Sequence, residues 1–193
     1  MQKLTRNDLY SLEHYASERG DFRTRVLAHK RNRKVMLGAH VSLLFEDRLT
    51  IQYQIQEMLR IERVFESAGI EEELDAYNPL IPDGGNLKAT MLIEYDDVDM
   101  RKTELEKLLR IEDHMTACVE GHPVVAAIAD EDMDRSNETK TSAVHFLRFE
   151  FTQAMIASAR DGADVEFACT HPAYSERTRV VGATRAGLLA DFD

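Results

Sequence analysis

The spacing of the apolar residues changes near Leu87, and this change limits the folds open to the chain. Before Leu87, most apolar residues recur at the three-to-four-residue spacing of amphipathic helices. After it, short segments alternate apolar and polar residues, as half-buried strands do. We therefore predict an α+β fold, in which N-terminal helices, including one long central helix, pack on a largely antiparallel sheet from the C-terminal half. A chain of 193 residues suits a single domain, residues 1–193.

Local signals divide the chain into elements. Asp8, Asp21 and Thr152 are helix-capping residues at the start of helical patterns. The predicted helices cover residues 8–19, 21–33, 49–69, 70–77, 99–113, 152–161 and 184–191. Residues 34–47 are expected to be extended, with Gly38 as a break, and the strand candidates are 86–95, 115–120, 123–130, 142–151 and 163–171.

Charge excludes some functions. The formal net charge of -11 repels phosphate backbones and argues against non-specific nucleic-acid binding. The one dense basic run, HKRNRK at 29–34, is expected to be a solvated face or the internal partner of acidic groups. No signal-peptide-like start and no apolar run of membrane-spanning length occurs, so a cytoplasmic location is expected.

The predicted helix 49–69 carries Glu57 and Glu62 among its apolar residues. A buried carboxylate must find a cation, hydrogen-bond donors, a metal or a proton, because leaving it unpaired costs several kcal/mol. An ion pair with residues 29–34, Lys88 or Arg148 is the structural interpretation, and a ligand or metal site is the functional one. Cys118 and Cys169 lie far apart in strand-like segments, and we expect buried free thiols.

The other side of the same helix is polar and suggests a ligand site. Its arginines could pair with an anion and its glutamines could orient it, although a solvated face is the simpler interpretation. A strand side chain would complete the pocket. The predicted ligand-binding residues are Arg48, Gln52, Gln56, Glu57, Arg60 and Arg148.

Two histidines suggest a metal site. Strand alternation places His145 and His171 on core-directed faces. With Glu57 and Glu62 they could hold a divalent ion, namely zinc, iron or manganese, although each histidine could instead be a hydrogen-bonded core residue. The motifs of zinc proteases, ferritin-like di-iron helices, phosphate-binding loops, dinucleotide-binding folds and serine hydrolases are all absent from the sequence.

An ordered set of segments resembles a bacterial family of unknown function, family 3501. These segments are LLFEDRLTIQYQIQEMLRIERVFE, LDAYNPLIPDGGNLKATMLIEY, IADED and KTSAVHFLRFEF. The resemblance covers nearly the whole chain and carries over no catalytic residue. It implies a cytoplasmic protein encoded near rubrerythrin-like and iron–sulfur oxidoreductase-like proteins, which would be its redox partners. Three hypotheses follow: an accessory or ligand-binding protein of a redox pathway, a metalloenzyme, and a structural interaction module.

Overall fold

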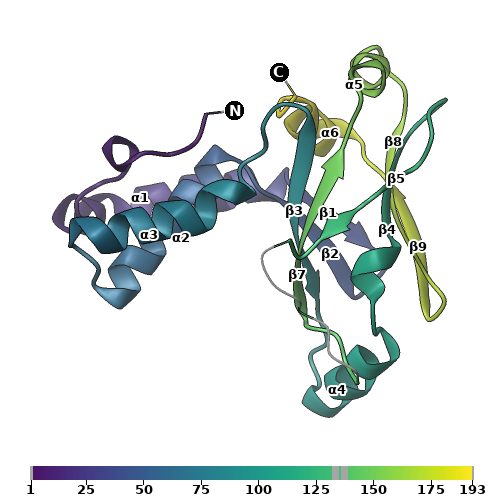
Figure 1. The fold of residues 1–193 in the computed structure, drawn as a ribbon, viewed down its shortest axis with the longest axis horizontal. Coiled ribbons are helices and arrows are strands. Elements are labelled where there is room, and N and C mark those ends of the chain that lie inside the picture. Colours follow the sequence, from purple (N-terminus) through teal and green to yellow (C-terminus); the bar gives the residue numbers. More distant parts are fainter. Residues whose placement is uncertain (1, 132–134, 136–138, 193) are drawn as a thin grey trace.

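Two antiparallel sheets form the body of the molecule (Figure 1). The structure is a computed structural model and describes residues 2–131, 135 and 139–192. The first sheet has the order β1-β2-β3-β7-β6, and its strands are Lys34–Leu37, Val41–Phe45, Asn86–Ile93, Val144–Glu150 and Ile128–Ala129. The second has the order β5-β4-β8-β9, with strands Val125–Ala126, Met115–Val119, Val165–His171 and Tyr174–Arg179.

The largest apolar cluster joins the two sheets. Inward residues alternate along β3, β7 and β8, and they meet at Phe167, whose ring centroid lies 4.8 Å from Phe45 and 5.3 Å from Phe149. Helices α5 (Gln153–Arg160) and α6 (Gly182–Leu189) contribute apolar residues to this cluster and lie at one end of the sheets. Helix α4 (Val98–Lys107) lies at the opposite end (Figure 1).

The first three long helices form a separate lobe beside the sheets (Figure 1). They are α1 (Leu12–Arg31), α2 (Arg48–Glu62) and α3 (Ser67–Tyr77). Their apolar residues form two clusters of their own, distinct from the cluster that joins the sheets. The predicted α+β class is confirmed, but these helices pack mainly on one another, and the first half of the chain also supplies β1, β2 and β3. No helix among the described residues is long and apolar enough to cross a membrane.

Several predicted helix boundaries are wrong. Asp8 does not cap the first helix, because α1 begins at Leu12 and is capped by Ser11. The predicted helix 99–113 ends at Lys107, and a separate 3-10 helix, Ile111–His114, follows it. Gly20 does not separate two helices, because α1 runs through it and is held by the buried side chains of Tyr15, Phe22 and Val26. The predicted helix 49–69 ends at Glu62, where Arg63 adopts a left-handed conformation (φ 57°), and α3 begins at Ser67. The predicted long helix is therefore two helices joined by a turn.

Most of the strand predictions are confirmed. Residues 34–47 form the β1–β2 hairpin, whose turn contains Gly38 at φ +64°. The predicted strands 86–95, 115–120, 142–151 and 163–171 contain β3, β4, β7 and β8, respectively. The segment 123–130 is not one strand: it divides into β5 and β6, which belong to different sheets. Strand β9 was not predicted. Both cysteines are free, with Cys169 buried and Cys118 half-buried.

Candidate metal centre

His145 points into the core from strand β7. The strand alternates buried and exposed residues, and His145 shares its inward face with Leu147 and Phe149, as the sequence predicted. Its side chain is 0% exposed. A buried imidazole needs partners for both ring nitrogens, and the structure supplies them from three other segments.

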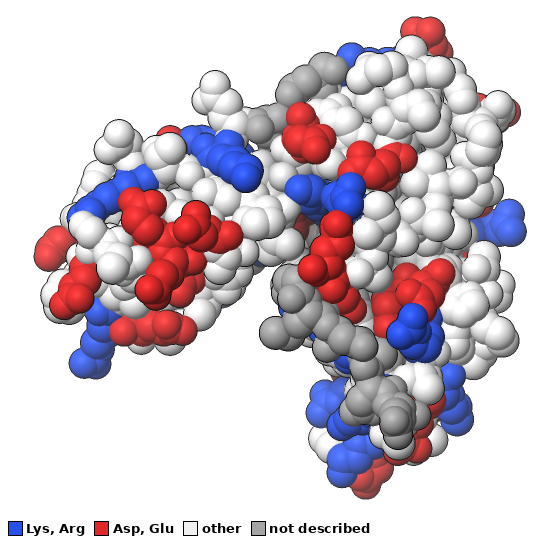
Figure 2. All heavy atoms as spheres, in the orientation of Figure 1, with Lys and Arg blue, Asp and Glu red and all other residues white. Residues whose placement is uncertain are grey.

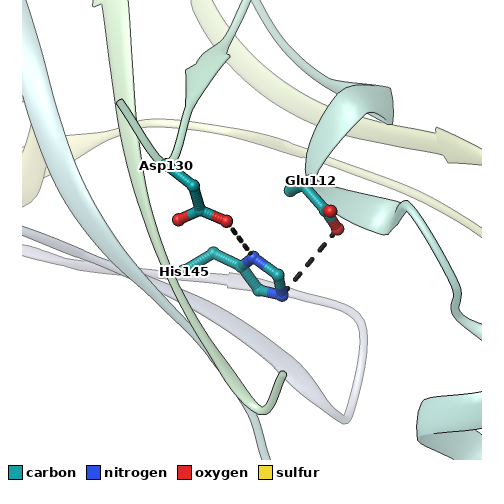
Figure 3. A group of neighbouring side chains, drawn as sticks. All are labelled: Glu112, Asp130 and His145. Atoms are coloured by element: carbon teal, nitrogen blue, oxygen red, sulfur yellow. Dashed lines mark hydrogen bonds and ion pairs between the residues drawn. The ribbon is translucent and has the colours of Figure 1, made fainter. Parts of the chain in front are cut away.

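The Nδ1 atom of His145 lies 2.6 Å from Oδ2 of Asp130 (Figure 3). On the other side of the ring, Nε2 lies 2.8 Å from Oγ1 of Thr141, 3.1 Å from the carbonyl oxygen of Ser142 and 3.8 Å from Oε2 of Glu112. The hydroxyl of Thr141 donates to Oε2 of Glu112 at 3.2 Å. Glu112 and Thr141 are both buried, so His145 sits in a closed cluster of polar atoms.

Backbone geometry explains why Asp130 reaches the histidine. Asp130 follows strand β6, and its N–H donates to the carbonyl oxygen of Phe146 at 2.8 Å. Asp130 has a left-handed backbone conformation (φ 49°), and its Oδ1 atom accepts the N–H of Phe146 at 2.9 Å. Oδ1 also lies 3.3 Å from Nη1 of Arg135, while Oδ2 is left to face His145.

Glu112 and Thr141 come from the other side of the cluster. Glu112 lies in the short 3-10 helix η3 (Ile111–His114), which leads into β4 of the second sheet. The backbone N–H of Thr141 donates to the carbonyl oxygen of Leu105 in α4 at 3.1 Å. The cluster thus joins strand β7 of the first sheet to η3, the 3-10 helix that precedes strand β4 of the second sheet.

The side chains of Glu112, Asp130 and His145 each offer an atom that can ligate a metal, and these atoms lie within 4.8 Å of one another. Among the residues that the structure describes, no other group of three His, Cys, Asp or Glu side chains meets this condition. Around Nε2, the atoms of His145, Thr141 and Glu112 form a triangle with sides of 2.8, 3.2 and 3.8 Å. Ligands about 2.1 Å from a shared ion are separated by about 3.0 Å in octahedral and about 3.4 Å in tetrahedral geometry, so the triangle has a suitable size.

Of the four residues predicted to bind a metal, only His145 lies in this cluster. Glu57 lies on α2 in the helical lobe, and it is bound by Arg19 through Nε and Nη2, each at 2.8 Å. Tyr15 donates to it at 2.8 Å, and Arg60 of the same helix at 3.1 Å. The Arg19 hydrogen bonds, with help from Arg60 and Tyr15, lower the pKa of Glu57 to about 2.

Glu57 therefore forms a structural ion pair, which was one of the two interpretations of the sequence. The partners that the sequence suggested for it were wrong. Neither residues 29–34 nor Lys88 nor Arg148 pairs with it, because α1 brings Arg19 alongside α2. Glu62 is exposed at the end of α2. His171 uses both ring nitrogens on the backbone: Nε2 lies 3.2 Å from the carbonyl oxygen of Leu109, and Nδ1 accepts the N–H of Ala173 at 3.2 Å.

The predicted ligand-binding face of α2 instead contacts the N-terminal segment. Gln56 is fully buried and accepts the N–H of Tyr10 at 2.5 Å. Gln52 donates to the carbonyl oxygen of Asp8 at 2.6 Å, and Arg48 pairs with the carboxylate of Asp8 at 2.5 Å. These contacts hold Asp8 and Tyr10 against the helix. Arg148 alone, of the predicted ligand residues, lines a large cleft, which lies between the helical lobe and β7.

Comparison with known proteins places the whole chain in one family. The family model described as a protein of unknown function (DUF3501) matches residues 3–192. The chain belongs to this family. A crystal structure from Burkholderia pseudomallei K96243, described as a novel protein of unknown function, is 49% identical to this DUF3501 chain and covers 100% of both chains with a TM-score of 0.94. No curated protein matches.

Sequence reasoning missed Glu112, Asp130 and Thr141. Each lies near the end of a strand or helix, but many carboxylates in the sequence do so as well. What distinguishes Glu112 and Asp130 is their approach to His145 from segments 33 and 15 residues away, which local spacing does not encode.

Proposed function

We propose that this DUF3501 chain binds a divalent metal ion at the Glu112–Asp130–His145 cluster and serves as an accessory protein of a redox pathway. The observation that carries the proposal is the convergence of three ligand-type side chains, from three separate segments, on one buried position. A core histidine needs only hydrogen-bond partners, which neutral groups can supply. Two carboxylates and an imidazole are also the ligand types that divalent metal ions bind in proteins.

The three residues have different roles in the proposed site. Glu112 Oε2 and His145 Nε2 bind the ion directly, and the hydroxyl of Thr141 and the carbonyl oxygen of Ser142 lie close enough to add oxygen ligands. When the ion binds, Asp130 accepts the Nδ1–H of His145, and Nε2 then offers its lone pair to the ion instead of donating a proton to Thr141 or Ser142. Arg135, beside Asp130, offsets part of the charge of that carboxylate.

The ligand types favour iron(II) or manganese(II). One imidazole nitrogen combined with oxygen atoms, without cysteine, suits these ions, whereas closed structural zinc sites usually include several cysteines or histidines. Zinc is the alternative ion. An iron or manganese ion would also give the chain a chemical link to the rubrerythrin-like and iron–sulfur oxidoreductase-like partners implied by the family resemblance.

Burial favours an accessory role over catalysis. His145 is 0%, Thr141 2% and Glu112 4% exposed, so the described side chains leave the ion little open surface on which a substrate could bind. An ion enclosed in this way joins η3 to β7 and stabilises the contact between the two sheets. A metalloenzyme would require an opening at this position, and the described residues close it.

Metal content tests the proposal. Tag-free protein is expressed in medium supplemented with iron, manganese and zinc, desalted, and analysed by inductively coupled plasma mass spectrometry. We expect near-stoichiometric iron or manganese in the wild-type protein and its loss in His145→Gln and Glu112→Gln. His40→Gln and Glu57→Gln are matched controls that remove an imidazole or a carboxylate elsewhere, and they should retain the metal.

Two results would contradict the proposal. The first is wild-type protein without metal, both as purified and after incubation with each ion. The second is equal loss of metal from the control variants and the cluster variants, which would place the ion elsewhere.

A further inference from the structure

A cleft of about 680 Å³ separates the helical lobe from the outer face of the first sheet. Its walls come from α2 and α3, from the 3-10 helix η2 (Asn78–Leu80), from β3 and β7, and from Glu131 and Arg135. A volume of this size is typical of sites that enclose a small molecule. The cleft lies on the face of β7 opposite to His145, because successive side chains of a strand point to opposite faces.

The sheet strands contribute two basic side chains to the cleft, and Glu131 lies beside them. Lys88 of β3 and Arg148 of β7 are directly opposed across the two strands, and like charges in such a pair repel each other. Arg148 is neutralised by Glu131 and Glu150. Lys88 donates only to the backbone carbonyl oxygens of Pro79 and Ile81, at 2.6 and 3.1 Å, and none of the described carboxylates lies within ion-pair distance of its amine.

The helical wall of the cleft is acidic. Glu73 of α3 is half-buried, and no Lys or Arg among the described residues forms an ion pair with it. Asp75 lines the same wall and is exposed. Figure 2 shows acidic side chains gathered on the helical lobe and, across the notch, a basic group on the sheet body with acidic side chains beside it.

Burial disfavours both charges in their present surroundings. Desolvation lowers the pKa of Lys88, and desolvation together with the carboxylates of Glu62 and Glu72 raises the pKa of Glu73. A neighbouring opposite charge would stabilise the charged form of Lys88 and of Glu73. The two residues lie on different walls of the cleft. A ligand with one charge of each sign would satisfy both.

Much of the remaining lining of the cleft is apolar. Tyr77, Leu80 and Met58 line it from the helical side, and Phe146 lines it from β7. The guanidinium of Arg135 lies over the ring of Phe146, with its carbon 4.6 Å from the ring centroid. Flat aromatic and aliphatic surfaces of this kind suit a ligand with a flat apolar body.

We propose that the cleft binds a small zwitterion with a flat apolar body, its carboxylate on Lys88 and its ammonium group on Glu73. An aromatic amino acid is the simplest molecule of this class. The proposal does not depend on the metal centre, because Lys88 and Glu73 take no part in the cluster, and the two sites share only the neighbouring side chain of Arg135 among the residues named for them.

Three probes that share an indole ring test the two charges separately. They are tryptophan, indole-3-propionate, which lacks the ammonium group, and tryptamine, which lacks the carboxylate. Binding to the full chain is measured by isothermal titration calorimetry. Because a hydrogen bond between charged groups changes affinity by about tenfold or more, we expect tryptophan to bind at least about tenfold more tightly than either truncated probe.

Two variants assign the charges to side chains. Lys88→Met should weaken tryptophan and indole-3-propionate but leave tryptamine unchanged, and Glu73→Gln should weaken tryptophan and tryptamine but leave indole-3-propionate unchanged. Lys34→Met and Glu94→Gln are matched controls from an exposed ion pair outside the cleft, and they should bind all probes as the wild type does. Thermal unfolding establishes that each variant is folded. If Lys88→Met fails to fold, the comparison of probes on the wild-type chain still decides the question.

Three outcomes would overturn the proposal: no saturable binding of tryptophan, tightest binding of indole-3-propionate or tryptamine, or tryptophan binding that neither variant weakens. The second outcome would assign the cleft to a ligand of a single charge.

Discussion

The Nδ1 atom of His145 lies 2.6 Å from the Oδ2 atom of Asp130, and this contact determines which ring nitrogen faces Glu112. An imidazole that donates from Nδ1 to a carboxylate presents Nε2 as its metal-binding atom. The same carboxylate accepts the backbone N–H of Phe146, so the orientation of the ring is tied to the edge of the first sheet.

The different roles of Asp130 and Glu112 predict different losses of affinity. Asp130→Asn should weaken iron(II) or manganese(II) binding by about 10–100-fold, because it disturbs only the residue behind the histidine. Glu112→Gln removes a direct ligand and should weaken binding more. Competition titration against a chelator of known affinity measures both. Equal effects of the two substitutions would contradict the assigned roles.

Glu57 should contribute a pH-dependent part of the stability. Its pKa is lowered to about 2 in the folded protein, chiefly by hydrogen bonds from Arg19. A lowered carboxyl pKa stabilises the fold above the ordinary value near 4.5, and this contribution is lost as the pH falls from there towards 2. At pH 7, Glu57→Gln should reduce the free energy of unfolding by about 1–2 kcal/mol.

Urea unfolding of the wild type and Glu57→Gln between pH 7 and pH 2 tests this prediction. The difference between the two proteins should shrink below pH 4.5. Glu94→Gln is the control, since its exposed pair with Lys34 should contribute less than about 0.5 kcal/mol. A difference that stays constant down to pH 2 would show that the Glu57 carboxylate is not stabilised by its partners.

Gln56 should anchor the N-terminal segment to α2. Gln56→Ala leaves the N–H of Tyr10 without its acceptor, at a cost of about 1–3 kcal/mol. Hydrogen exchange of residues 5–10 should therefore accelerate strongly. Gln52→Ala removes a half-buried donor to Asp8 and should have the smaller effect. Unchanged exchange in Gln56→Ala would mean that other contacts hold this segment.

Gly38 should tolerate no side chain. Its φ of +64° favours glycine, and an added Cβ would lie 2.7 Å from the hydroxyl of Tyr174. That hydroxyl is itself fixed, because it donates to the carbonyl oxygen of Leu37 and accepts the N–H of His40. Gly38→Ala should lower the free energy of unfolding by about 2–4 kcal/mol, from backbone strain and overpacking together.

Gly121→Ala separates the two causes. Gly121 also has a positive φ, +81°, but an added Cβ there meets nothing within 4 Å. Thermal unfolding should show a loss of only about 1–2 kcal/mol for this variant. Equal losses at both glycines would mean that the contact with Tyr174 adds no cost.

The sequence predicted those parts of the fold that depend on the spacing of nearby residues, such as strand alternation. The alternation in β7 placed His145 in the core, and residues 34–47 were predicted to be extended with a break at Gly38, which lies in the turn of the first hairpin. The end of α2 was missed because Arg63, rather than glycine, adopts the left-handed conformation there. The predicted helix break at Gly20 is wrong, because packing of α1 on α2 outweighs the low helix propensity of glycine.

The partners of buried charges were less predictable. Arg33, in the basic run 29–34, is buried and pairs with Asp191, which is 158 residues away. Glu57 likewise pairs with Arg19, and His145 with Asp130. The sequence shows that such groups need partners, but the partners are chosen by the packing of distant elements. For this reason one predicted metal-binding residue lies in the cluster and its companions were not found.

Anomalous X-ray diffraction from crystals of the metal-supplemented protein tests the central claim most directly. Data collected above and below the iron and manganese absorption edges show both the position and the identity of an ion. We predict an anomalous peak between Nε2 of His145 and Oε2 of Glu112, present above one of these edges and absent below it. Crystals of metal-supplemented protein with no peak at this position, and with the hydroxyl of Thr141 still bridging His145 and Glu112, would contradict the account.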